Sequence, residues 1–60
     1  MKISFPKLAV QVNHFEDIVT GYSLYVDDAY EGTYPTKTDL EFRIGLIITT
    51  ELNRGLEDDV

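Results

Sequence analysis

The sequence contains no cysteine, so two common ways of stabilising a short chain are excluded. Disulfide bonds and thiolate zinc sites both require cysteine. A chain of 60 residues buries only about 60% of the surface that its unfolded form exposes. Packing alone, or a second chain, must therefore supply the stability. We expect a single small domain with a thin core.

Basic residues are scarce, with five Lys and Arg against eleven Asp and Glu and a net charge of −6. Binding to nucleic acid depends on clustered Lys and Arg that neutralise phosphates. Binding to anionic membrane surfaces has the same requirement. We therefore expect neither direct nucleic-acid binding nor membrane binding, and the partner that suits this charge is a basic protein surface.

Long apolar runs are also absent. The first residues lack the apolar run of about 7 to 15 residues that a signal peptide needs, and no stretch approaches the roughly 18 apolar residues of a membrane span. We expect a cytoplasmic protein. Residues 1–60 form one acidic domain in this interpretation, with a frayed tail at 57–60.

What is present in the first half is alternation of apolar and polar residues. It covers 8–13 and again 22–27, and this is the period of half-buried strands. Asp27 and Asp28 suit a turn, because short acidic side chains accept hydrogen bonds from nearby backbone groups. A third strand then returns over 30–34. The pattern predicts an antiparallel meander of two to three strands.

From Thr38 the pattern changes to that of a helix. Residues Thr38 to Glu41 form a capping box, and Arg54 with Gly55 suits a helix end. Between them the apolar residues on one helical face are Leu40, Ile44, Ile47, Ile48 and Leu52. The predicted fold is α+β, a small meander with one C-terminal helix packed on it. Residues 41–50 also alternate as a strand would, so an all-β fold is the alternative.

Phe42 and Leu46 form a second apolar stripe, one helical turn apart and away from the main face. In one interpretation they lie under the sheet edge or the N-terminal arm. In the other they remain exposed and dock a second copy or a partner. The second interpretation predicts a homodimer through this stripe.

No arrangement of residues indicates catalysis. The tetrapeptide Tyr25 to Asp28 resembles the one that binds magnesium in reverse transcriptases. Two-metal chemistry also needs a carboxylate on a neighbouring strand and a basic channel for the template, and this chain has no room for either. His14, the single histidine, has no nucleophile at triad spacing, and the acids do not match an EF-hand. We expect no enzyme activity, no cofactor and no metal site.

The acidic residues of the first half are unopposed. Between Lys7 and Lys37 there are no bases, and the acids are Glu16, Asp17, Asp27, Asp28 and Glu31. All four tyrosines lie in the same segment, and tyrosine is enriched at binding hot spots. The predicted partner-binding residues are Tyr25, Asp27, Asp28, Tyr30 and Glu31. The alternative is that the tyrosines half-fill a thin core and the acids only keep the chain in solution.

In size and acidity the chain is similar to phage-encoded blockers of host nucleases, including anti-CRISPR, anti-restriction and uracil-glycosylase inhibitor proteins. The resemblance implies a protein-binding inhibitor or modulator that mimics nucleic acid and occupies a basic groove, in the host cytoplasm if a phage encodes it. The alternative function is a structural or regulatory subunit, antitoxin-like or an assembly protein, that acts through Phe42 and Leu46.

Overall fold

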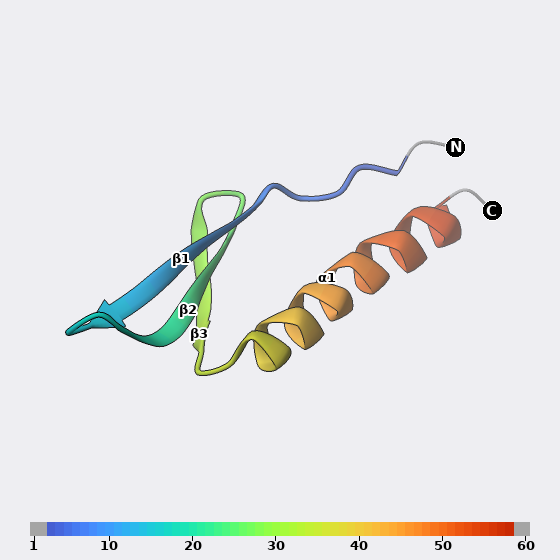
Figure 1. Cartoon of the computed structure of the whole chain (residues 1–60). Coiled ribbons are helices and arrows are strands. Elements are labelled where there is room, and N and C mark those ends of the chain that lie inside the picture. Colours follow the sequence, from blue (N-terminus) through green and yellow to red (C-terminus); the bar gives the residue numbers. More distant parts are fainter. Residues whose placement is uncertain (1–2, 59–60) are drawn as a thin grey trace.

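The computed structural model describes residues 3–58, which form a three-stranded sheet followed by one helix (Figure 1). The elements are β1 (Leu8–Phe15), β2 (Ile18–Val26), β3 (Ala29–Tyr34) and α1 (Lys37–Asp58). The strands are antiparallel in the order β1-β2-β3, so β2 is the central strand. The α+β prediction is confirmed, and the all-β alternative is wrong because residues 41–50 are helical.

Both hairpins close through two acidic residues in the left-handed backbone region. The φ angles are 50° at Glu16 and 66° at Asp17 in the first turn, and 51° at Asp27 and 68° at Asp28 in the second. Positive φ at both central residues is the mark of a type I′ turn, whose twist matches that of the flanking strands. The Asp27-Asp28 turn is confirmed. The Glu16-Asp17 turn was not predicted, and it extends both flanking strands beyond the alternating segments.

The core lies where α1 covers β2. Leu24, in the middle of β2, is fully buried, and Leu40 in the first turns of α1 is 8% exposed. Leu24 pairs with Val10 on β1 and Gly32 on β3, so these three residues share the sheet face that α1 covers. Within the described part of the chain, α1 packs against β2 and β3 and does not reach β1.

The N-terminus of α1 is capped by Thr36. Its hydroxyl oxygen accepts a hydrogen bond from the backbone N–H of Asp39 at 3.2 Å, and its carbonyl accepts one from Leu40 at 3.2 Å. The predicted start at Thr38 is therefore wrong by one to two residues, because the earlier threonine satisfies the first free N–H groups.

The predicted stop at Gly55 is also wrong, because α1 continues to Asp58. The glycine instead permits a close contact: a Cβ atom at this position would lie 2.7 Å from Cγ1 of Ile3. The N-terminal arm, residues 3–7, therefore runs beside the C-terminal half of the helix (Figure 1). Glu57 belongs to α1, and residues 59–60 of the predicted frayed tail lie outside the described residues.

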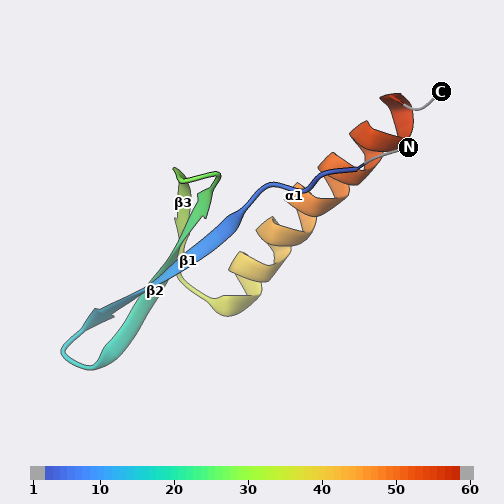
Figure 2. The same ribbon diagram turned by 90° about the horizontal axis from the view of Figure 1, so that it is seen from above.

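The molecule is elongated, as Figure 2 shows. Its principal extents are 52 × 20 × 12 Å. The radius of gyration is 14.1 Å, against about 10 Å for a compact chain of this length. The β1–β2 hairpin projects from one end and the second half of α1 from the other.

None of the helical residues among 3–58 forms a segment long and apolar enough to cross a membrane.

Candidate functional site

The turn between β2 and β3 brings together four of the five residues predicted to bind a partner. We call this set the acidic tip; its members are Tyr25, Asp27, Asp28 and Tyr30. Tyr25 and Tyr30 are cross-strand neighbours, with ring centroids 5.9 Å apart and planes at 64°, an edge-to-face pair. Tyr30 is 61% exposed. The tip therefore presents an aromatic ring to solvent beside two carboxylates.

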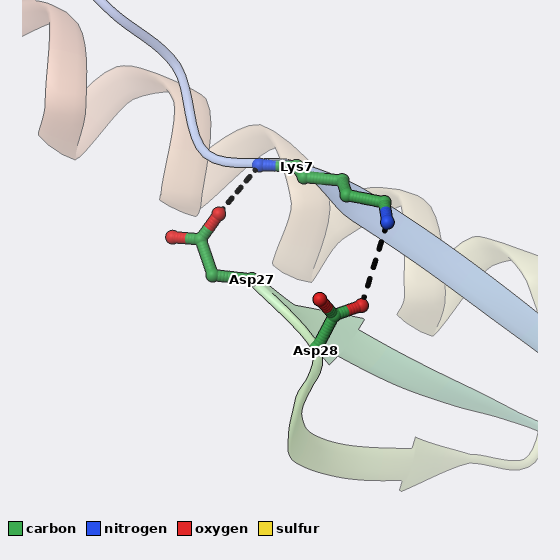
Figure 3. Close-up of polar contacts among 3 residues, drawn as sticks. All are labelled: Lys7, Asp27 and Asp28. Carbon is green, nitrogen blue, oxygen red and sulfur yellow. Dashed lines mark hydrogen bonds and ion pairs between the residues drawn. The ribbon is translucent and has the colours of Figure 1, made fainter.

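The two aspartates of the tip are held by Lys7, the residue before β1 (Figure 3). The backbone N–H of Lys7 donates to Oδ1 of Asp27 at 2.9 Å, and the N–H of Asp27 donates to the Lys7 carbonyl at 2.8 Å. Nζ of Lys7 lies 3.5 Å from Oδ1 of Asp28, and both side chains are largely exposed. A long, exposed ion pair of this kind contributes little to stability. It therefore leaves the Asp28 carboxylate accessible to a stronger basic partner.

A chain of hydrogen bonds across the sheet fixes Tyr30. Its hydroxyl lies 2.7 Å from that of Thr33, which lies 3.2 Å from that of Ser23, and Ser23 accepts a bond from Asn13 at 2.9 Å. These residues lie on the sheet face away from α1 and come from all three strands. The network also satisfies Ser23, which is only 8% exposed. Sequence reasoning missed it, because neighbours across a sheet are defined only once the strand register is known.

Glu31 is the predicted site residue that the structure separates from the acidic tip. The register of β2 and β3 shifts between Leu24 and Tyr25, which leaves Glu31 as an extra residue in β3. The bulge directs its carboxylate to α1, where it forms a hydrogen-bonded ion pair with Arg43. The hydrogen bond that Arg43 donates to Glu31 raises the pKa of Arg43 above its ordinary value, and the negative charge of Glu31 raises it further. The ion pair attaches β3 to α1.

Phe42 and Leu46 are both on the surface of α1, 70% and 44% exposed. The interpretation that they lie under the sheet edge or the N-terminal arm is wrong. The helix turns Leu40 toward the sheet instead, and the arm meets α1 near its far end, at Gly55. Beside Leu46 is a shallow open hollow of about 180 Å³, lined by Arg43, Leu46, Ile47, Thr50 and Glu51.

Within residues 3–58, no group of three or more acidic or histidine side chains converges on a metal position. His14 is exposed on β1 and belongs to no such group. Comparison with protein-family models, with curated proteins and with solved structures found no match to this chain. The acidic tip and the exposed apolar residues of α1 are therefore the two candidate binding surfaces of the described chain.

Proposed function

We propose that this chain is a non-catalytic, acidic protein-binding module that inhibits or modulates a basic partner by docking its acidic tip on the partner's surface. The observation that carries the proposal is that the side chain of Tyr30 is exposed and yet held in place by its neighbours. Its ring is mostly exposed, yet the edge of Tyr25 and the hydroxyl of Thr33 hold it in one position. A large aromatic side chain that is fixed before binding loses little conformational entropy on binding.

The charge of the chain supports the same partner class. Asp27 and Asp28 lie between the two tyrosines of the tip, on exposed turn positions, and the whole chain carries a net charge of −6. Complementary charge raises the rate of association with a basic surface and makes binding sensitive to salt. The two carboxylates would then occupy phosphate positions in a groove that otherwise holds nucleic acid. Blocking such a groove requires no catalytic group. In this proposal the protein and its target are both in the cytoplasm.

The test compares two double variants that remove the same charge from the two turns. Asp27→Asn with Asp28→Asn should weaken binding at least tenfold at low salt, because it removes the carboxylates beside Tyr30. Glu16→Gln with Asp17→Asn should change the affinity less than threefold, because the first turn lies at the other end of β2. The measurement is calorimetric titration of the partner captured from a lysate of the producing cell. Equal losses in both variants would show that only net charge matters and would contradict the proposal.

A second pair of variants tests the aromatic part of the tip. Tyr30→Ala should weaken binding more than Tyr30→Phe, because phenylalanine retains the ring and its contact with Tyr25 and loses only the hydroxyl bonded to Thr33. Unchanged affinity in Tyr30→Ala would remove Tyr30 from the binding surface.

The second candidate function is a structural or regulatory subunit that inserts the stripe of Phe42 and Leu46 into an apolar pocket of a partner. The exposure of Phe42 favours it, since a phenylalanine that contacts so little of its own chain is suited to an interface. In this case Phe42→Ser should abolish capture of the partner while the Asp27 and Asp28 variant retains it. The acidic-tip proposal predicts the opposite result.

A further inference from the structure

The outer edge of β1 is the least protected part of the fold, and we propose that it pairs with β1 of a second copy of this chain. The two strands would run antiparallel about a two-fold axis and join the two sheets into one of six strands. This inference does not rest on the acidic tip, which lies at the turn between β2 and β3.

The two edges of the sheet differ in how they are protected. β3 is six residues long, is bulged at Glu31 and is attached to α1 by the Glu31–Arg43 ion pair. Bulges, charges and covering elements are the features that prevent a sheet edge from pairing with another chain. Among residues 3–58, no charged side chain or covering element protects the outer side of β1, and its register with β2 shifts only at Asn13 and His14, beyond the segment 8–12. Its eight residues, Leu8–Phe15, include no proline and no Asp, Glu, Lys or Arg.

The outer edge of β1 also lacks partners within the molecule. Among the described residues, no backbone hydrogen bond from outside the sheet reaches this edge, and α1 does not contact the strand. A long, uncharged edge with free N–H and C=O groups is a template for strand addition.

Apolar side chains beside this edge are left uncovered. Val10 and Val12 are each 43% exposed, although they pair with Leu24 and Tyr22 on the sheet face that α1 covers. Val19, on the neighbouring strand, is 46% exposed. α1 packs on β2 and β3, so among residues 3–58 the apolar surface that continues over β1 stays largely uncovered.

The total surface is consistent with a missing partner. The chain exposes 4634 Å², against about 4,000 Å² for a compact monomer of 6.9 kDa. The excess of about 600 Å² approaches the roughly 800 Å² that each partner buries in an interface of standard size. Pairing of the two β1 strands would cover part of this excess surface and would provide hydrogen-bond partners for the free N–H and C=O groups of the edge.

A second copy fits this edge because β1 is complementary to itself. With the two-fold axis at Gln11, each Val10 lies opposite Val12 of the second copy, and the two Gln11 residues lie opposite each other. This register keeps the two valines on the α1 side of the joined sheet and Gln11 on the other side, so that no side chain of the central pairs changes face. No like charges meet within the paired strands, because β1 carries no Asp, Glu, Lys or Arg.

Cysteine cross-linking tests the register directly, since the natural chain has no cysteine. In the proposed dimer the Cβ atoms of the two Gln11 residues are about 5 Å apart, within a small adjustment of disulfide geometry. Gln11→Cys should therefore form a covalent dimer under mild oxidation. The matched control is Thr33→Cys, which lies in the same row across Ser23 but on the β3 edge. We expect cross-linking at least tenfold faster at position 11. Equal rates, or no cross-link at position 11, would overturn the proposal.

Sedimentation equilibrium provides the second readout. At about 100 µM the natural chain should have twice the monomer mass of 6.9 kDa, and Phe42→Ser should also be dimeric. Val12→Lys should be monomeric with an unchanged circular dichroism spectrum, because a lysine on the edge opposes strand pairing and the side chain is already partly exposed. A monomeric natural chain, or a Val12→Lys variant that remains dimeric, would contradict pairing through β1. If Val12→Lys unfolds, the cross-linking comparison decides.

The salt dependence separates this interface from the acidic tip. Dimerisation brings together two chains of net charge −6, so screening by salt should strengthen the dimer. Binding of a basic partner at the tip should weaken under the same conditions. A dimer that dissociates as salt is raised would contradict an interface built on the uncharged strand.

Discussion

The two β-hairpins close with the same kind of turn, but only one of them is supported by the rest of the chain. The β2–β3 hairpin is attached to Lys7 at its turn and to α1 through Glu31. No other part of the described chain supports the turn of the β1–β2 hairpin in this way, and Phe15 and Ile18 beside that turn are each 67% exposed. Turn chemistry therefore fixes the shape of both hairpins, whereas packing stabilises one of them. An isolated two-stranded hairpin is only marginally stable, so the first turn should open more readily than the second.

The largest expected effect comes from removing the core side chain. Leu24→Ala should lower the free energy of unfolding by about 3 kcal/mol, because a fully buried leucine leaves a cavity that the thin core cannot close. Ile18→Ala, in the unsupported hairpin, should lower it by less than about 0.5 kcal/mol. Urea unfolding followed by circular dichroism measures both. If Ile18→Ala lowered the free energy of unfolding as much as Leu24→Ala does, the side chains beside the first turn would have to be packed in solution.

An intermediate effect is expected from relieving the backbone strain in the turns. Replacing Glu16-Asp17 with Asn-Gly should stabilise the protein by about 1 kcal/mol, because asparagine and glycine adopt positive φ more readily than the acids do. The same change at Asp27-Asp28 should stabilise less, because an asparagine amide accepts the hydrogen bond from the Lys7 N–H more weakly than the Asp27 carboxylate does. Thermal unfolding of the two variants gives the comparison. A larger gain at the second turn would mean that Lys7 adds no support there.

The smallest effect concerns α1, the element that supports the second hairpin. Gly45→Ala should stabilise the helix by somewhat less than about 1 kcal/mol, since nothing lies within 4 Å of the added Cβ atom. Gly55→Ala should gain less, or lose stability, because its Cβ atom would meet Ile3 at 2.7 Å. Melting temperatures of the two variants distinguish these outcomes. Equal gains would indicate that the N-terminal arm does not pack on the helix in solution.

Features that depend on neighbouring residues in the sequence could be predicted. The alternation in the strands, the Asp27-Asp28 turn and the helical face of α1 are all local patterns of this kind. The Glu16-Asp17 turn was missed although it is also local. Glutamate rarely adopts positive φ, so nothing in its chemistry marks Glu16 as a turn residue. The backbone conformation of Glu16 follows from the pairing of β1 with β2 on either side of the turn.

Features that depend on register or on distant contacts could not be predicted. The acidic tip was found because its four residues lie within one hairpin. Glu31 was assigned to it by proximity in sequence, and only the bulge shows that its side chain reaches α1. Gly55 has the signature of a helix stop, and its role in receiving Ile3 appears only when the arm is placed beside the helix.

The contact between Ile3 and Gly55 has a consequence for chain topology. It places the first and last parts of the described chain side by side, at the end of α1 remote from the sheet (Figure 1). A short peptide linker could therefore join these ends, and new termini could be opened at the Glu16-Asp17 turn. Such a circularly permuted chain would keep α1, the arm and the second hairpin in one uninterrupted segment.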